Sequence, residues 1–229
     1  MDTKGAAPTA TPAGSVAALL LLADGRFPDG SHAHSFGMEA AVHAGRVHDS
    51  RTLNDYVETR LWTTTRTDAA AAALAADGAA TLDQVDAALV LRMPGAAQRA
   101  ASRSLGRSLA RTADRLWPQR APRLTDGRPP LQPVAFGAVA TLAGCSPLEA
   151  ALCVTHSSAA ALANAALRLL GLDPFSVASV LAELRETVGT VAASVMEIRE
   201  PDRLPHAATP FSEIDPELQL TIEPRLFGS

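Results

Sequence analysis

Apolar and polar positions follow a helical rhythm along most of the chain. Apolar residues recur every three or four positions in several segments, and only a helix places residues with that spacing on one side. The clearest case runs from Val177 to Ile198. No segment shows persistent alternation with a period of two, which is typical of half-buried strands. These patterns predict an all-α fold.

Capping and breaking residues divide this pattern into about seven to nine helices. Two capping boxes, Thr81 with Gln84 and Ser146 with Glu149, are the clearest start signals. The helices are expected over residues 16–23, 35–44, 50–76, 82–93, 95–117, 134–143, 147–170 and 174–200.

The segments between and beyond these helices are expected to be irregular. Residues 1–14 are small and contain prolines, which predicts a disordered N-terminal tail. Residues 118–133 contain five prolines and predict a long mobile loop. Residues 201–229 contain five more and predict an extended C-terminal tail. Residues 15–200 would then form a single layered multi-helix domain.

Composition excludes several classes of protein. The longest apolar stretch near the start, Val16 to Ala23, is far shorter than the ~20 residues of a membrane-spanning helix. The net charge of −4 argues against general attraction to nucleic acid or to an anionic membrane. Cys145 and Cys153 are too few for a disulfide scaffold, so reduced thiols in a cytoplasmic protein are expected.

Positive charge is concentrated in one region. Nine arginines lie between Arg92 and Arg128, and the five from Arg99 to Arg115 are spaced four apart along one predicted helix (Arg99, Arg103, Arg107, Arg111 and Arg115). This stripe fits a solvated face, a docking stripe for an acidic partner, or a nucleic-acid contact. The last is disfavoured because aromatic residues are not interleaved with the arginines.

The sequence contains none of the common phosphate-binding, dinucleotide-binding or metalloprotease motifs, which favours a binding or scaffold protein. Functional residue types are densest from Gly30 to Glu39. His32 and His34 could bind a borderline metal such as nickel, or could serve only in packing and hydrogen bonding. Glu39 suits the positive end of a helix dipole, which would explain it without any function.

The same segment carries a family resemblance. The run from Leu19 to Gly45 resembles the opening of the UreF-type urease accessory proteins. The motif positions within it are Pro28, Gly30, Ser31, His34, Ser35 and Gly37. Pro133 to Gly137, Asn164 to Leu170 and Arg225 to Ser229 resemble later family elements in the same order.

The resemblance implies a non-enzymatic, all-helical protein that forms a homodimer. It would join a UreD/UreH-like accessory protein and the UreG-like GTPase, and would couple GTP hydrolysis to nickel insertion into the urease apoenzyme. No tightly bound cofactor is implied, and nickel would contact His32 and His34 only in transit. Glu39 and Arg168 fall at positions associated with coupling to the GTPase.

The tail is expected to bind a partner. Its apolar positions include Leu226 and Phe227, which follow Arg225 in the closing motif. Docking on the chain's own helices is the alternative. For Arg168, the alternative to coupling is pairing with the helix C-terminal dipole and burial of its stem.

Two other functions remain open on the residues alone. One is a helical metal-binding enzyme that uses His32, His34 and Glu39. The other is a nucleic-acid-binding regulator that uses the arginine stripe, although neither nucleic acid nor a membrane is the expected partner.

Overall fold

The computed structural model describes residues 12–118, 128–206, 210–223 and 226–227, and every regular element in these ranges is helical. The all-α prediction is therefore confirmed for the described part of the chain. The α-helices are α1 (Pro12–Ala23), α2 (Met38–His43), α3 (Ser50–Arg60), α4 (Arg66–Asp77), α5 (Leu82–Val90), α6 (Ala96–Leu116), α7 (Gln132–Ala143), α8 (Pro147–Leu170), α9 (Pro174–Glu183), α10 (Arg185–Ser194) and α11 (Pro210–Gln219). The shorter helical segments are η1 (Ser31–Ala33), η2 (Leu61–Thr65) and η3 (Pro201–Arg203).

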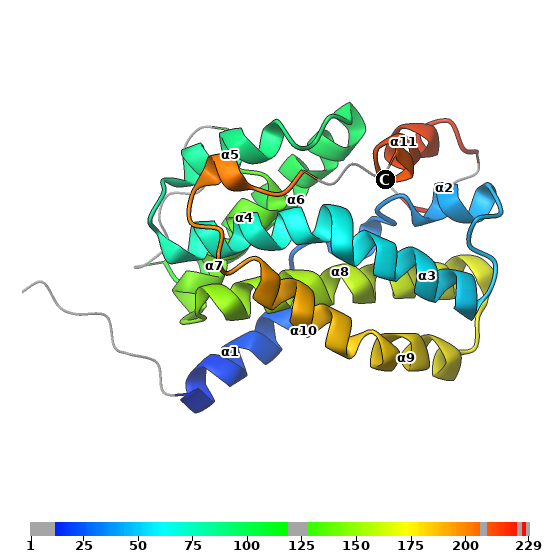
Figure 1. Cartoon of the computed structure of the whole chain (residues 1–229), viewed down its shortest axis with the longest axis horizontal. Coiled ribbons are helices and arrows are strands. Elements are labelled where there is room, and N and C mark those ends of the chain that lie inside the picture. Colours follow the sequence, from blue (N-terminus) through cyan, green and yellow to red (C-terminus); the bar gives the residue numbers. More distant parts are fainter. Residues whose placement is uncertain (1–11, 119–127, 207–209, 224–225, 228–229) are drawn as a thin grey trace, which may run out of the picture.

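Helices α4, α7 and α8 form the centre of the molecule (Figure 1). Helix α4 packs against both α7 and α8, and α6 packs along α7. Helix α8 also contacts α1, α2, α3, α9 and α10. Helix α11 lies at one end of the molecule beside α2 and α6. The last helix of the chain is thereby brought next to one of the first.

Small residues set the spacing of the central helices. The alanines from Ala69 to Ala75 of α4 are buried. Gly137 of α7 faces this run, and a Cβ atom at Gly137 would collide with the carbonyl oxygen of Ala72. The two backbones can approach this closely only because residue 137 has no side chain.

Both predicted capping boxes form. The Thr81 hydroxyl accepts a hydrogen bond from the Gln84 N–H at 3.2 Å, and the Gln84 amide oxygen accepts one from the Thr81 N–H at 2.9 Å. The Ser146 hydroxyl accepts from the Glu149 N–H at 3.3 Å, and the Glu149 carboxylate accepts from the Ser146 N–H at 2.7 Å. Helix α8 ends at the left-handed Gly171, as its sequence predicts.

Two predicted helices are divided, so the estimate of seven to nine helices was too low. Segment 50–76 contains the π-helical turn η2 between α3 and α4. The Thr63 hydroxyl within this turn donates to the Thr59 carbonyl at 2.7 Å, a bond that commonly bends helices. Segment 174–200 changes direction at Leu184, between α9 and α10. The apolar rhythm continues through both breaks, so it did not reveal them.

The prediction of an extended tail over 201–229 is wrong for Pro210–Gln219, which forms α11. Pro210 is the first residue of this helix, where a missing N–H costs nothing. Contacts with the rest of the protein stabilise the helix despite Pro216 in its interior. The prolines therefore predicted the wrong structure for this segment.

The other irregular segments are only partly described. Residues 1–11 of the predicted disordered tail lie outside the described ranges, but residues 12–14 are helical because α1 begins at Pro12. Residues 119–127 of the predicted mobile loop also lie outside those ranges. That loop ends earlier than predicted, since Gln132 and Pro133 already belong to α7.

Helix α8 is long and apolar enough to cross a membrane by length and composition alone. Half of its most apolar window is buried inside the protein, however, and five other helices besides α4 and α7 contact it. These contacts are those of a helix that packs in the core of the protein.

Candidate functional site

The motif from Pro28 to Gly37 contains η1 and leads into α2 through tight turns. Gly30 and Gly37 have φ angles of +86° and +88°, which glycine adopts without strain. Phe36 lies between them with a φ of +54°, an uncommon conformation for a bulky residue. Backbone strain of this kind is found most often at functional sites, which supports a special role for the turn.

Helix α6 holds the start of the motif in place. The Thr112 hydroxyl of α6 donates a hydrogen bond to the Pro28 carbonyl at 2.9 Å. The Asp29 carboxylate accepts from the N–H of Ser31 at 2.8 Å and closes the next turn. The motif is therefore a fixed loop on the surface of α6.

Three polar side chains form a connected network at the centre of the site. The Ser35 hydroxyl donates to the Gln219 amide oxygen at 2.8 Å, and the Gln219 amide nitrogen donates to the Glu39 carboxylate at 3.0 Å. Glu39 is 6% exposed, and the other two side chains are fully buried. Leaving any of these groups without a partner would cost about 1–3 kcal/mol, so the network fixes α11 against α2.

Glu39 also binds the described end of the chain. Its carboxylate accepts hydrogen bonds from the main-chain N–H groups of Leu226 at 2.5 Å and Phe227 at 3.2 Å. The Phe227 ring is buried in the apolar cluster formed by α2, α3, α8 and α9. In this structure Phe227 docks on the chain's own helices, the alternative that the sequence leaves open, whereas the Leu226 side chain is exposed. Docking of these two residues on a partner stays a prediction. Arg225 lies outside the described residues.

Arg168 contacts the ring of Phe227. Its guanidinium carbon lies 4.5 Å from the centre of the Phe227 ring, a cation–π arrangement. The same guanidinium donates to the His32 carbonyl at 3.4 Å. The structure thus brings together Glu39, Arg168 and Phe227, three residues that the family resemblance had singled out.

The two motif histidines occupy different environments. His32 is exposed, and His34 is half-buried with its ring centre 6.0 Å from that of Phe36. Burial lowers the pKa of the His34 imidazole. Among the described residues, His, Cys, Asp and Glu side chains form no group of three or more that could hold a metal ion. A nickel contact at His32 and His34 stays a prediction.

Helix α11 carries a buried ion pair that the sequence did not predict. Asp215 is fully buried and forms a salt bridge with Arg46. Burial raises the pKa of the Asp215 carboxyl, and the hydrogen bond from Arg46 opposes that rise. Glu217, also on α11, accepts a hydrogen bond from the N–H of Ala97 at the start of α6 at 2.7 Å. Asp215 and Glu217 thereby tie α11 to Arg46 and to the start of α6.

The outward face of α11 is apolar. Phe211, Ile214 and Leu218 are 56%, 46% and 46% exposed and have the spacing of one helix face. A helix that buries an aspartate and a glutamine while exposing three large apolar side chains reverses the usual arrangement. An exposed apolar face of this kind is typical of a binding surface.

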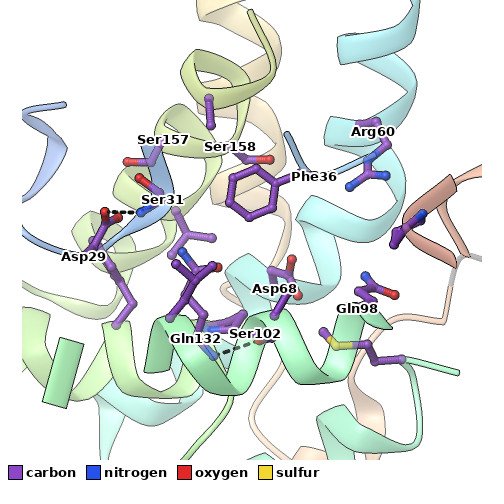
Figure 2. A pocket seen from close by; sticks show the side chains of 18 residues that line it. Asp29, Ser31, Phe36, Arg60, Asp68, Gln98, Ser102, Gln132, Ser157 and Ser158 are labelled. Atoms are coloured by element: carbon purple, nitrogen blue, oxygen red, sulfur yellow. Dashed lines mark hydrogen bonds between the residues drawn. The ribbon is translucent and has the colours of Figure 1, made fainter. Parts of the chain in front are cut away.

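A cavity of about 100 Å³ lies behind the motif, among α4, α6, α7 and α8 (Figure 2). Ser31 and Phe36 of the motif line it together with Asp68 of α4. Burial raises the pKa of the Asp68 carboxyl to about 7, and the charge of Arg60 at the edge of the cavity acts in the opposite direction. The cavity therefore contains an acid that changes its protonation near neutral pH.

The arginines of α6 do not form one continuous stripe. Arg103 is almost fully buried and forms a double hydrogen bond with Asp86 at 2.6 Å. Arg99 donates to the carbonyls that precede α6. Exposed arginines remain at Arg107, Arg111 and Arg115. The interpretation of all five as a single exposed face is therefore wrong.

Comparison with known proteins agrees with the resemblance. The UreF family model matches residues 47–185. A protein from Mycobacterium sp. (strain JLS) named urease accessory protein UreF is 42% identical over 179 residues, which span 78% of this chain and 84% of that protein. Proteins of the same name from Mycobacterium tuberculosis and Mycolicibacterium vanbaalenii are 40% and 38% identical, over 78% and 82% of this chain and 84% and 90% of their own lengths. The chain belongs to the UreF family of urease accessory proteins.

Proposed function

We propose that this chain acts without catalysing a reaction, as the protein that joins a UreD/UreH-like scaffold to the UreG-like GTPase during urease maturation. In this role it couples GTP hydrolysis to the insertion of nickel into the urease apoenzyme. The observation that carries the proposal is the network in which Glu39, Arg168 and Phe227 meet. A partner that displaced the Phe227 ring would uncover both the Glu39 carboxylate and the Arg168 guanidinium.

The apolar face of α11 is the surface we assign to the UreD/UreH-like partner. Phe211, Ile214 and Leu218 offer a helix face that can be laid into an apolar groove. The polar side of the same helix is bound to Glu39 through Gln219. Docking on α11 would therefore act directly on the site that contains Glu39.

Coupling to the GTPase would act through shape and charge. A protein without a phosphate-binding loop can change GTP hydrolysis in a partner by positioning that partner's mobile segments or by offering a cation. Arg168 is a cation that contacts the motif through the His32 carbonyl, and its ring partner Phe227 belongs to the segment that Glu39 holds. A change at α11 could thus expose or withdraw the Arg168 guanidinium.

Nickel in this proposal is cargo, and we assign no tightly bound cofactor to the chain. The exposed His32 and the half-buried His34 are the candidates for a passing contact. A homodimer, which the family resemblance implies, and a cytoplasmic location, which the small number of cysteines favours, complete the proposal.

The test is co-expression with UreD/UreH-like, UreG-like and urease proteins, followed by size-exclusion chromatography and nickel measurement. The double variant Ile214→Asp, Leu218→Asp should lose the complex with the UreD/UreH-like protein and leave urease without nickel. Leu91→Asp is the control, because Leu91 is 78% exposed and lies directly after α5, away from α11. Equal complex formation by both variants would refute the assignment of α11.

A further inference from the structure

The contacts of Glu39 with residues 226 and 227 have the chemistry of peptide recognition. A carboxylate accepts two consecutive main-chain N–H groups, at 2.5 and 3.2 Å, and the ring of the second residue is enclosed. Main-chain bonds supply affinity for any sequence, and a pocket for one side chain supplies the choice of sequence. Both parts are present at this position.

The ring of Phe227 is the specific part of this recognition. It packs into the apolar cluster of α2, α3, α8 and α9, and the Arg168 guanidinium lies 4.5 Å from its centre. An arginine over a ring face favours an aromatic side chain over an aliphatic one of similar size. The Leu226 side chain is 53% exposed, so the residue before the ring is selected only weakly.

The receptor itself does not depend on the segment it holds. Gln219 fixes the Glu39 carboxylate from α11, and Ser35 fixes Gln219 from the motif. The His32 carbonyl accepts a hydrogen bond from Arg168 and so orients its guanidinium. These bonds hold the acceptor and the cation in place whether or not Phe227 lies between them.

We propose that Glu39 and Arg168 form a peptide-binding site that the chain fills with its own Leu226 and Phe227, and that a partner protein's segment with an aromatic residue can take their place. The ligand class is an extended peptide with two consecutive main-chain N–H groups, the second belonging to an aromatic residue. The inference deepens the proposed coupling role of Glu39 and Arg168. It is nevertheless tested without any urease protein, so each can fail separately.

The experiment uses a fluorescently labelled peptide with the sequence of residues 221–229, TIEPRLFGS, and the full-length chain. In the wild type the internal segment occupies the site, so the peptide must compete with it. In Phe227→Ala the internal ring is gone, and we expect the peptide to bind at least about tenfold more tightly than to the wild type. Fluorescence anisotropy measures both affinities, and circular dichroism checks that each variant is folded.

Two controls identify the site. A peptide with alanine in place of its phenylalanine should not bind Phe227→Ala. Adding Glu39→Gln to Phe227→Ala should weaken binding by at least about tenfold, because an ion-assisted acceptor is lost. If Phe227→Ala does not fold, Phe227→Leu retains the apolar volume and serves the same purpose. Absence of peptide binding to a folded variant, or binding unaffected by Glu39→Gln, would overturn the proposal.

Discussion

Glu39 is held by groups from three parts of the chain. Ser35 orients Gln219, Gln219 donates to the carboxylate, and residues 226 and 227 donate through their main-chain N–H groups. These donors are buried or half-buried, so an acceptor lost at Glu39 is not readily replaced by water. Glu39 therefore has a structural role in addition to the coupling role expected for its family position.

The structural role predicts a loss of stability. We expect Glu39→Ala to lower the free energy of unfolding by about 2–4 kcal/mol, because several buried donors lose a charged acceptor. Urea denaturation followed by circular dichroism measures this value. Glu58→Ala is the control, since Glu58 is exposed on α3 and should change stability by no more than about 0.5 kcal/mol. A Glu39→Ala protein as stable as this control would contradict the role.

Asp68 makes stability depend on pH. Its pKa rises from 3.8 in the unfolded chain to about 7 in the folded protein, mainly because burial disfavours the charged carboxylate. Between these two values the folded protein keeps a proton that the unfolded chain has released. The free energy of unfolding should therefore fall as the pH rises from about 4 to about 7, and this penalty should remain above pH 7.

We expect Asp68→Asn to remove most of this pH dependence. The wild type should lose at most about 4 kcal/mol of stability over this range, at 1.36 kcal/mol per pKa unit. The variant should match it at low pH and exceed it at about pH 8. Urea unfolding at about pH 5 and about pH 8 measures the difference. Parallel pH profiles for the two proteins would show that Asp68 titrates normally.

At the scale of elements, sequence signals within one helical turn predicted helix ends correctly. Helices that depend on contacts with distant parts of the chain were not predicted. The capping boxes at Thr81 and Ser146 were predicted because both partners lie three residues apart. Helix α11 was missed because its stabilising partners are far away: Gln219 and Glu39 are 180 residues apart. One usable signal was present, since Asp215 and Gln219 are spaced for one helix face beside the apolar Ile214 and Leu218.

The docking of α11 predicts a local effect. Gln219→Ala removes the hydrogen bonds to both Ser35 and Glu39, so α11 should open more often while the central helices stay protected. We expect the amides of α11 to exchange with solvent at least about tenfold faster, as measured by hydrogen exchange and mass spectrometry. Leu218→Ala changes only the exposed face and should leave the exchange rates as they are. Faster exchange throughout the protein would indicate global destabilisation instead.

At the scale of the whole molecule, the sequence predicted the fold class and the approximate helices but not how they pack. The family resemblance named Glu39, Arg168 and Phe227. In the structure Glu39 binds the main chain of Phe227, and Arg168 lies over its ring. The family resemblance did not point to Gln219 or Asp215, because the contacts of these residues depend on the path of the whole chain. The packing of α4 against α7 likewise depends on alanine and glycine, whose hydrophobic periodicity in the sequence is weak.

The close contact of α4 with α7 gives the last prediction. A methyl group at Gly137 would overlap the Ala72 carbonyl, and a backbone carbonyl cannot rotate away as a side chain can. We therefore expect Gly137→Ala to force the two helices apart and to destabilise the protein by about 3 kcal/mol or more. Gly189→Ala is the matched control, because Gly189 also lies within a helix, α10, but nothing stands within 4 Å of its added methyl group. There the higher helix propensity of alanine should stabilise the protein by up to about 1 kcal/mol. Thermal and urea unfolding measure the change in stability of each variant. The prediction requires Gly137→Ala to destabilise and Gly189→Ala to stabilise the protein, because helix propensity alone would make both substitutions stabilising.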